Sequence, residues 1–288
     1  MKVLITGAGG QLGQALQSIA PAGTHIVPFG HAALDIADAS AVSAAVVQHR
    51  PDLIINAAAY TAVDKAESDV VAARAINATG PANLAFAARD ARARLVHVST
   101  DFVFDGVSGM PYRPDAPTAP LGVYGATKRE GEEAVFSAKP DALIVRTAWV
   151  YGSTGGNFVR TMLRLMMERD EVRVVADQIG TPTFASGLAG AIWALDEAGA
   201  TGIHHWTDSG AASWYDFAVA IQEEALALGL LSRRASVLPI PTTAYPTPAR
   251  RPHYSVLNKE ATFALLGRPA PHWRENLRRM LKDIQTND

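Results

Sequence analysis

The 288-residue sequence predicts an α/β fold, a doubly wound parallel sheet with a smaller, discontinuous C-terminal lobe. In the first two thirds of the chain, short apolar runs alternate with alanine-rich helical stretches. This alternation is typical of parallel sheets that carry helices on both faces. The pattern changes after Tyr151, where a loop of small residues at 152–156 interrupts it. The length suits one large domain or two modest ones.

Five apolar runs of strand length precede that loop, with helical patterns between them. We expect strands at Lys2–Thr6, His25–Phe29, Leu53–Asn56, Leu95–Ser99 and Leu143–Thr147. We expect helices at 11–20, 38–49, 64–91 and 122–138. Ligands of such sheets bind beyond the carboxyl ends of the strands, which is where the distinctive residues of this chain fall.

The C-terminal third mixes helical and extended segments. We expect helices at 157–169, at Ala185–Ala198 and after the capping residue Ser213, a strand at Gly202–Trp206 and an extended proline-rich stretch at Pro239–Pro252. His204 and His205 are strand neighbours that face opposite sides, so we interpret them as structural rather than as a metal pair. We assign 1–151 and about 183–206 to the sheet domain, and about 152–182 and 207–288 to the lobe.

Bulk composition excludes several classes of function. The formal charge of −2 provides no basic surplus for nonspecific nucleic-acid binding. The absence of cysteine excludes disulfides, zinc–thiolate sites and thiol catalysis. The first apolar run reaches a glycine loop after five residues, and no stretch approaches the roughly 20 apolar residues of a membrane span. We therefore expect a cytoplasmic protein that binds neither nucleic acid nor membranes.

A glycine loop joins the first strand to the first helix. Its glycines stand at Gly7, Gly10 and Gly13, with Gln11 and Leu12 opening the helix. Glycine permits a tight turn, close approach of the backbone to a pyrophosphate, and close packing of helix on strand. Free N–H groups at the helix start attract the phosphates. We therefore predict a dinucleotide site in a Rossmann-type domain, the alternative being an ordinary tight turn; the GxxGxxG spacing favours short-chain dehydrogenases.

The end of the second strand bears on the choice of cofactor. NAD-specific sites usually place an acid there for the ribose 2′-hydroxyl, whereas this strand ends Phe29-Gly30-His31. The sequence therefore favours NADPH, with NADH as an alternative, and His31 is either near the 2′-phosphate or a solvent-facing loop residue. We expect Asp35 and Ile36 at the adenine edge, and the small residues after the third strand along the cofactor: Asn56, Ala57, Ala58 and Ala59.

Tyr124 and Lys128 are spaced to share one face of a helix. Reduction of a ketone needs a proton donor as hydride arrives. A neighbouring ammonium that favours phenolate lowers a tyrosine pKa from its usual value near 10 and eases proton exchange. Thr100, at the end of the fourth strand, could hydrogen-bond the carbonyl oxygen. We predict these three as catalytic residues; a surface tyrosine beside a solvated lysine is the alternative.

Several longer sequence motifs point to one particular family of proteins. They are the runs 56–67, 99–104, 146–151, 157–158, 177–183 and 247–252. Together they resemble the dTDP-4-dehydrorhamnose reductases, an extended short-chain dehydrogenase family. The resemblance implies NAD(P)H-dependent reduction of the C4 ketone of dTDP-4-dehydro-β-L-rhamnose to dTDP-L-rhamnose. It implies that Tyr124 is the acid, that Lys128 orients the ribose and lowers the tyrosine pKa, and that Thr100 holds the carbonyl oxygen.

Several residues are candidates for contact with the sugar nucleotide. Trp149 follows the fifth strand, where its flat apolar ring suits either a deoxysugar or core packing. Arg250 and Arg251 lie in the proline-rich segment, and a guanidinium fork there suits the dTDP diphosphate. With the resemblance, we also expect substrate contacts from Asp101, Phe102 and Asn157.

The sequence departs from the family at two positions. Some members resemble each other in binding a divalent cation through glutamates at a dimer interface. This chain has Gln14 after the glycine loop and Phe184-Ala185-Ser186 after the Pro-Thr pair, so neither position carries a carboxylate. We therefore expect no tightly bound metal, and either a monomer or a weak homodimer that no metal bridges.

Two rival functions stay open at this point. A non-catalytic regulatory subunit, similar to the beta subunit of methionine adenosyltransferase, would share the fold, although the catalytic residues argue for an enzyme. A reductase or epimerase of another nucleotide-4-keto-6-deoxysugar would share the site. An epimerase must hold its NAD tightly, whereas a reductase must release NADP⁺.

Overall fold

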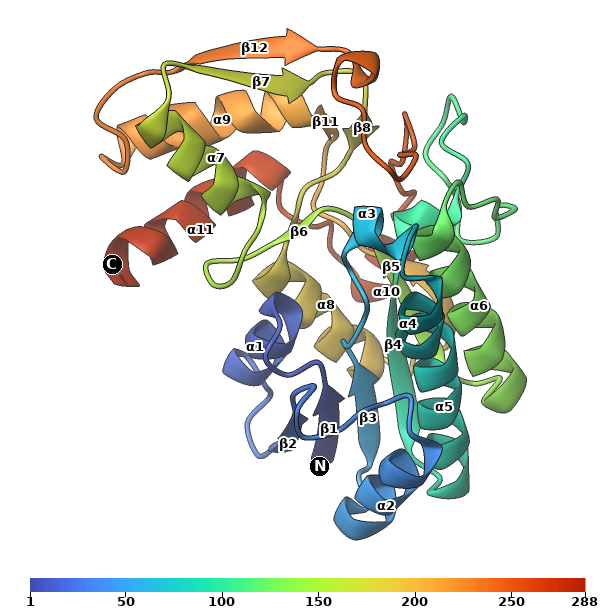
Figure 1. The fold of residues 1–288 in the computed structure, drawn as a ribbon. Helices are drawn as coiled ribbons and strands as arrows, with labels where there is room; N and C mark the ends of the chain where they lie inside the picture. Colours follow the sequence, from blue (N-terminus) through green and yellow to red (C-terminus); the bar gives the residue numbers. More distant parts are fainter. Residues whose placement is uncertain (288) are drawn as a thin grey trace.

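The computed structural model describes residues 1–287, with side chains to residue 286. A parallel sheet of order β10-β5-β4-β3-β1-β2 forms the larger half of the molecule (Figure 1). Its strands are β1 (Lys2–Thr6), β2 (His25–Phe29), β3 (Leu53–Asn56), β4 (Arg94–Thr100), β5 (Leu143–Thr147) and β10 (Gly202–His205). The strand order reverses at β1, between β2 and β3, and a ligand crevice is expected at such a switch point.

Helices cover both faces of the sheet, as strand alternation requires. Along β1, Val3 and Ile5 pack on one face and Leu4 on the other. The first face is covered by α1 (Gln11–Ser18) and α8 (Ala185–Glu197). The second is covered by α2 (Ala39–His49), α5 (Gly80–Asp90) and α6 (Val123–Ala138). The predicted doubly wound α/β fold is therefore confirmed.

Most of the chain from Val150 onward, apart from α8 and β10, forms a lobe beside the carboxyl ends of the sheet strands (Figure 1). Its helices are α7 (Phe158–Glu168), α9 (Trp214–Ala227) and α11 (Trp273–Asn287), with α10 (Glu260–Leu266) against β10. Its strand pairs are β12 (Ser236–Ile240) with β7 (Glu171–Val175), β11 (Ala212–Ser213) with β8 (Ile179–Gly180), and β6 (Val150–Tyr151) with β9 (Thr183–Phe184). A core of its own joins α7, α9 and α11, around Phe217 and Met280.

The single helix expected at 64–91 is wrong in its first part. The structure has α3 (Val63–Ala66), a break, α4 (Val70–Arg74), a π-helical turn η1 (Ala75–Thr79) and then α5. Asp69 leaves helical geometry at the break, in keeping with its preference for turns. Pro81 has no N–H to donate to the carbonyl oxygen of Asn77. The backbone widens into a π-helical turn just before it, where Gly80 N donates to the Ala75 oxygen.

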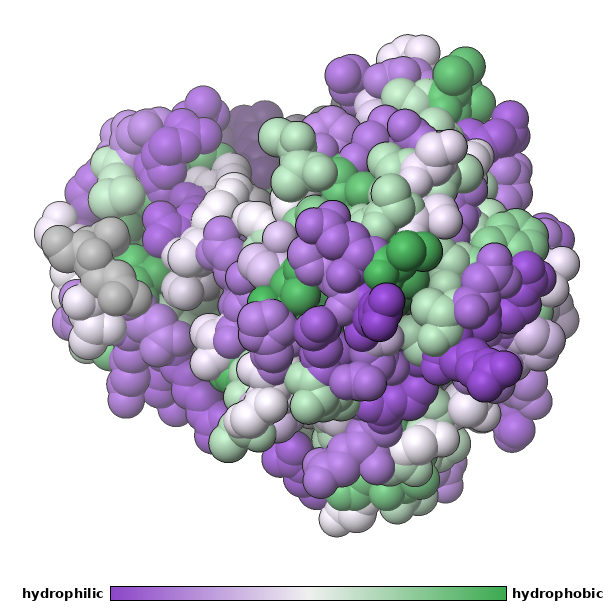
Figure 2. All heavy atoms as spheres, turned by 90° about the horizontal axis from the view of Figure 1, so that it is seen from below, coloured by the Kyte–Doolittle hydropathy of each residue, from purple (hydrophilic) through white to green (hydrophobic). Residues whose placement is uncertain are grey.

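Two features of the lobe also differ from expectation. The paired strands β7 and β12 were not predicted, because neither run stands out from the polar sequence around it. Pro239–Pro252 is extended only in part: it begins within β12 and continues through the 3₁₀ turn η3 (Thr242–Ala244). No helix among residues 1–287 is long and apolar enough to cross a membrane. The lower face of the molecule is mainly hydrophilic, with hydrophobic side chains in small separate groups (Figure 2).

Candidate active site

One large cavity lies where the carboxyl ends of β1, β3, β4 and β5 meet the lobe. Its volume of about 1090 Å³ exceeds the roughly 300–1,000 Å³ usual for one small ligand, so it has room for two. Most of the predicted site residues line it together: Gly7, Gly10, Gln11, Leu12, Gly13, His31, Asp35, Ile36, Ala57, Ala58, Ala59, Thr100, Asp101, Phe102, Tyr124, Lys128, Trp149 and Arg251. Asn56, Asn157 and Arg250 are not on this lining.

The glycine loop turns tightly from β1 into α1. Gly7 has φ +68°, and a Cβ there would lie 2.6 Å from the carbonyl carbon of Ala57. A Cβ on Gly13 would lie 2.2 Å from the Gly7 oxygen. Both positions therefore require glycine. Gly7 needs it because its φ is positive, and both need it because a Cβ would collide with neighbouring backbone. The turn leaves the first N–H groups of α1 facing the cavity, where they can bind an anion.

The far end of the dinucleotide region is formed by the loop after β2. His31 and Asp35 are exposed on the lining, and Ile36 is buried beneath them against Gly80. The Asp35 carboxylate accepts a hydrogen bond of 2.9 Å from Ala37 N, so it stabilises its own turn. The position directly after the strand carries no acid, as the sequence indicated.

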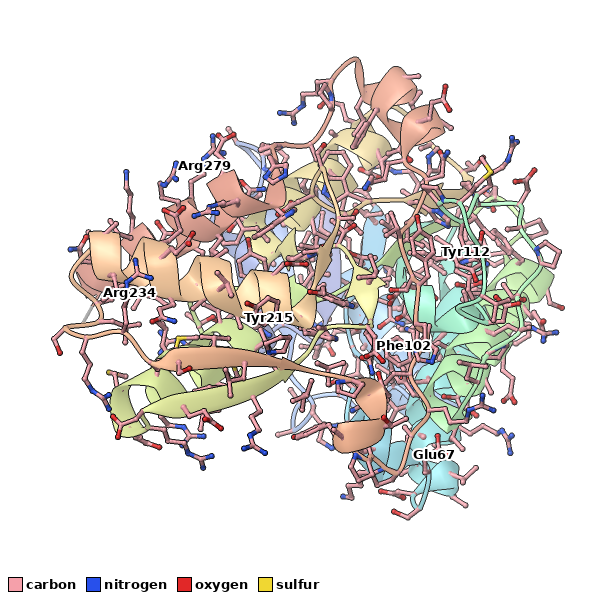
Figure 3. The ribbon with its side chains drawn as sticks, turned by 90° about the horizontal axis from the view of Figure 1, so that it is seen from above. Glu67, Phe102, Tyr112, Tyr215, Arg234 and Arg279 are labelled. Carbon is pink, nitrogen blue, oxygen red and sulfur yellow. The ribbon has the colours of Figure 1, made fainter. Side chains whose placement is uncertain are left out.

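Thr100, Tyr124 and Lys128 converge on the middle of the cavity. Thr100 ends β4, and the other two lie one turn apart on α6. Gly125 lets α6 approach, since a Cβ there would lie 2.2 Å from the Phe102 oxygen. The Phe102 ring packs edge-on against Tyr124, 5.4 Å between centroids. Phe102 is labelled in Figure 3, at the carboxyl end of the sheet.

Lys128 is fully buried, and its ammonium is tied to the backbone. Its Nζ donates to the Val98 oxygen at 2.7 Å and lies 3.5 Å from Nε2 of His97. Burial lowers the pKa of Lys128 to about 8, although the Glu132 charge raises it. Burial and the Lys128 charge also hold the pKa of His97 well below its usual value. The histidine is therefore neutral at pH 7 and adds no second positive charge.

Lys128 is not among the groups that shift the pKa of Tyr124 in this structure. Burial raises the pKa of Tyr124 to about 12; a hydrogen bond with Thr100 lowers it, and the Asp101 charge raises it. The physical reason is that the phenol sits in a desolvated site beside a carboxyl group, while the lysine ammonium is directed at the Val98 oxygen. Tyr124 is thus held firmly in its protonated form, which suits a proton donor.

Asp101 has its carboxyl group buried beside Thr100. The Thr100 hydroxyl donates to Asp101 Oδ1 at 3.0 Å and accepts from Phe102 N at 3.2 Å. Burial raises the pKa of Asp101 to about 6, although hydrogen bonds with Ser255 and Thr100 lower it. The group therefore titrates near neutral pH within reach of the predicted proton donor.

Trp149 and Trp214 form an aromatic wall on the lobe side of the cavity. Their rings stack at 3.5 Å between centroids with an interplanar angle of 7°. Trp149 has φ +48°, a left-handed conformation that costs a non-glycine residue about 1–3 kcal/mol and is typical of functional sites. The sequence reasoning missed Trp214; its only local signal is an aromatic residue directly after a helix cap.

The structure separates the two adjacent arginines. Arg251 lines the cavity, and its guanidinium bonds both carboxylate oxygens of Asp64, at 3.0 and 2.7 Å. These bonds hold the pKa of Asp64 below its usual value. Arg250 is exposed and is not on the cavity lining, so the structure does not bring it together with the other expected substrate residues. Two neighbouring residues in an extended chain point to opposite sides, which separates the two side chains.

Two predicted contact residues serve as scaffold instead. Asn56 is buried, where its amide group accepts from Thr6 Oγ1 at 2.7 Å and bonds Nδ1 of His97 at 3.0 Å. Asn157 caps α7 by accepting from Arg160 N, and it donates to Gln11 Oε1 at 2.9 Å. Short polar side chains commonly cap helices, so Asn157 connects the lobe to the glycine loop rather than lining the cavity.

The family model described as RmlD substrate binding domain matches residues 1–286. The chain belongs to the dTDP-4-dehydrorhamnose reductase family. This confirms the resemblance found in the sequence. The dTDP-4-dehydrorhamnose reductase of Escherichia coli K12 is 43% identical over 298 residues, which cover 99% of each chain. A probable dTDP-4,6-dihydroxy-2-methyloxan-3-one 4-ketoreductase of Streptomyces antibioticus is 45% identical over 99% of this chain and 96% of its own.

A solved structure of the family has the same architecture. The crystal structure of dTDP-4-dehydrorhamnose reductase from Bacillus anthracis Ames, in complex with NADP, superposes with a TM-score of 0.93. It is 40% identical, covering 98% of this chain and 99% of that one. The family therefore includes a protein of this fold that binds NADP.

Proposed function

We propose that the chain reduces the C4 ketone of dTDP-4-dehydro-β-L-rhamnose to dTDP-L-rhamnose with NADPH, NADH being an alternative donor. One observation carries the proposal: Thr100, Tyr124 and Lys128 line the same cavity as the glycine loop. The names of the family relatives support the choice of substrate.

The residues present fit a dinucleotide. A Cβ on Gly9 would meet no atom within 4 Å, so the loop opens onto free space beside the start of α1. The Gly7–Gly13 loop would hold the pyrophosphate; His31, Asp35 and Ile36 would lie along the adenosine half, and Ala57–Ala59 along the middle. When bound, the cofactor supplies the hydride. His31 is the one imidazole on the lining that could approach a 2′-phosphate.

The protein's own part in the reaction is to hold the ketone and deliver a proton. Tyr124 donates its phenolic proton to the C4 oxygen as negative charge develops there. Thr100 turns its hydroxyl proton from Asp101 to the same oxygen, which orients the carbonyl. Lys128 orients the ribose from a position one helical turn beyond the phenol that gives up its proton. Each proton that leaves Tyr124 is replaced from solvent before the next turnover.

The sugar nucleotide would occupy the lobe side of the cavity. Trp149 provides a flat apolar wall for the deoxysugar, while Asp101 and Phe102 contact the ring from the end of β4. Arg251 faces the diphosphate. Asn157 and Arg250 contribute no contact in this proposal, because neither lines the cavity.

The experiment compares wild type with Tyr124→Phe in an assay of NADPH depletion with enzymatically made dTDP-4-dehydrorhamnose. We expect kcat to fall by roughly 10²-fold or more, because the general acid is lost. Tyr112→Phe is the matched control: Tyr112 is also buried and donates to Asp105 at 2.5 Å, outside the cavity. A Tyr124→Phe enzyme as active as the control would contradict the mechanism.

A reductase of another dTDP-keto sugar is a second candidate. The Streptomyces antibioticus relative favours it, since that protein bears a different substrate name at 45% identity. A panel of dTDP-4-keto-6-deoxysugars, ranked by kcat/KM, distinguishes the two. Cofactor that stays bound through gel filtration would instead indicate an epimerase, and a protein without turnover on any panel member would indicate a regulatory subunit.

We further propose that the protein is cytoplasmic, and a monomer or a dimer that no metal bridges. Gln14 and Phe184 occupy the two positions at which the family resemblance implies glutamates, and no cluster of three or more His, Asp or Glu side chains forms among the described residues. Residues 1–151 with about 183–206 would act as the dinucleotide domain, and 152–182 with 207–288 as the substrate lobe. Dissociation of a dimer by EDTA, or loss of activity, would overturn the metal-free assignment.

A further inference from the structure

Trp149 is held from several sides in a conformation that it would not adopt alone. Its left-handed backbone directs the chain from β5 of the sheet into the lobe. Its carbonyl oxygen accepts a hydrogen bond of 3.1 Å from Thr183 N in β9. A strained conformation persists only where its surroundings over-determine it, so the groups packed on the indole decide where the ring stands.

Gly180 is one of those groups. A Cβ at this position would lie 2.7 Å from Cε2 and 2.8 Å from Nε1 of Trp149. Its φ does not require glycine, so the constraint is the indole and not the backbone. This gives a physical reason for glycine in the segment 177–183, one of the stretches that carried the family resemblance.

Trp214 is the second group, and it covers the indole with a full parallel ring. It is the first residue of α9, where Ser213 and Asp216 form a capping box that fixes the start of the helix. On its own far side Trp214 packs against Phe158, 4.6 Å between centroids. The start of α9 can be located in Figure 3 from the label of the adjacent Tyr215. The wall is thus anchored to the first turns of both α9 and α7.

We propose that Trp214 is a positioning residue: by stacking on Trp149 it holds that indole as the wall for the 6-deoxysugar, and so sets the affinity for the sugar nucleotide. The inference rests on the proposed reductase function. Its expected signature is a change in KM for the ketone with kcat nearly unchanged, because the wall contacts the ring in ground state and transition state alike. If Trp214 served only the core of the lobe, its replacement would lower folding stability without a selective change in KM for the ketone.

The stacked pair offers a readout that does not depend on activity. Two indoles in parallel planes at 3.5 Å couple their electronic transitions, and a twist between the two transition dipoles gives an exciton couplet in the far-ultraviolet circular dichroism spectrum. Trp214→Ala and Trp214→Phe should both abolish the couplet. Trp206→Phe should keep it, because Trp206 is buried against Phe263 in another core cluster. Trp206→Phe therefore serves as the control for loss of a buried tryptophan.

The kinetic experiment uses the same variants and Gly180→Ala. An aromatic pair contributes about 0.5–1.5 kcal/mol, so we expect Trp214→Ala to raise KM for dTDP-4-dehydrorhamnose roughly fivefold. Its kcat should stay within about twofold and its KM for NADPH should not change. Trp214→Phe, which retains a flat ring, should recover most of the affinity. Gly180→Ala should raise the same KM by displacing Trp149 from the other contact, with Trp214 intact.

Each alternative result overturns the inference. If Trp214→Ala loses the couplet but keeps the KM of Trp206→Phe, Trp149 is positioned without its neighbour. If Trp214→Phe is as impaired as Trp214→Ala, the indole N–H itself binds substrate. Equal losses for ketone and NADPH would indicate collapse of the cavity. If wild type lacks reductase activity, the proposed function fails. The positioning role of Trp214 is then tested by calorimetric affinity for dTDP-L-rhamnose in place of KM. If wild type does not bind dTDP-L-rhamnose either, both the proposed function and the positioning role are overturned.

Discussion

The two ends of the cavity are built in different ways. From the dinucleotide end to the middle of the cavity, the chemistry comes from residues close in sequence: a glycine loop between β1 and α1, and a tyrosine and lysine one turn apart on α6. At the sugar end, each feature joins distant segments, such as Trp149 with Trp214 and Asp64 with Arg251. The first end therefore follows from backbone geometry, and the second from packing. Substitutions in the first region should lower kcat or the use of NADPH, whereas substitutions at the sugar end should mainly raise KM for the sugar nucleotide.

The largest expected effect tests the local end through Lys128. Lys128→Met should lower kcat by about 10²-fold or more, because the ribose, and with it the hydride donor, is no longer held in position. Stability should stay within about 1 kcal/mol of wild type, since an apolar chain replaces a buried ammonium whose pKa burial has lowered to about 8. Lys139→Met, beyond the end of α6 and outside the cavity, is the control in the NADPH assay. Equal activity of the two variants would remove Lys128 from the mechanism.

The second prediction tests the loop. Gly13→Ala should lower kcat/KM for NADPH by roughly 10²-fold, because its Cβ collides with the Gly7 oxygen and shifts the turn that faces the pyrophosphate. Gly190→Ala is the matched control on α8, which packs against α1: its Cβ would lie 3.8 Å from Ile19, an ordinary contact. NADPH titrations of both variants, with circular dichroism to verify folding, decide the point. If both variants bind NADPH alike, the close approach at Gly13 is unimportant.

The third prediction concerns the join between sheet and lobe, where Asp208 is buried. Burial raises the pKa of Asp208 to about 7, so the folded carboxyl keeps its proton while the unfolded one loses it near pH 4. Between these values the folded state binds the extra proton, and its stability falls as pH rises, by up to about 1.4 kcal/mol per pH unit. Urea unfolding of Asp208→Asn at several pH values should show a smaller slope, the remainder coming from groups such as Asp101, whose pKa burial raises to about 6. An unchanged slope would mean that Asp208 is ionised when folded.

The smallest effect should appear at the arginine pair. Arg251→Lys should raise KM for the sugar nucleotide about fivefold, because an ammonium cannot bond Asp64 and a phosphate in the planar fork of a guanidinium. Arg250→Lys is the control, since its exposed side chain lies outside the cavity. Neither change should affect KM for NADPH. A larger effect at Arg250 would reverse the assignment of the two side chains.

Sequence reasoning succeeded where a local rule governs the chain. The sheet strands, the glycine turn and the shared helix face of Tyr124 and Lys128 follow from periodicity and spacing, and the structure has all three. Sequence reasoning failed where contacts with distant segments decide the orientation of a side chain. Asn157 and Arg250 carried plausible chemistry but are not on the cavity lining, and Trp214 and His97 contact predicted site residues without any spacing that marks them.

The sequence by itself determined the fold class, the family and the placement of Tyr124 and Lys128 on one helix face, because alternation, glycine spacing and helical period act over a few residues. The tertiary structure alone decided which indole stacks on Trp149, which arginine meets Asp64, and the protonation of Tyr124, whose pKa burial raises to about 12. These depend on desolvation and on contacts between segments far apart in the chain. No local sequence pattern encodes the desolvation of a side chain or its contacts with distant segments, since both arise only when the lobe packs against the carboxyl ends of the sheet.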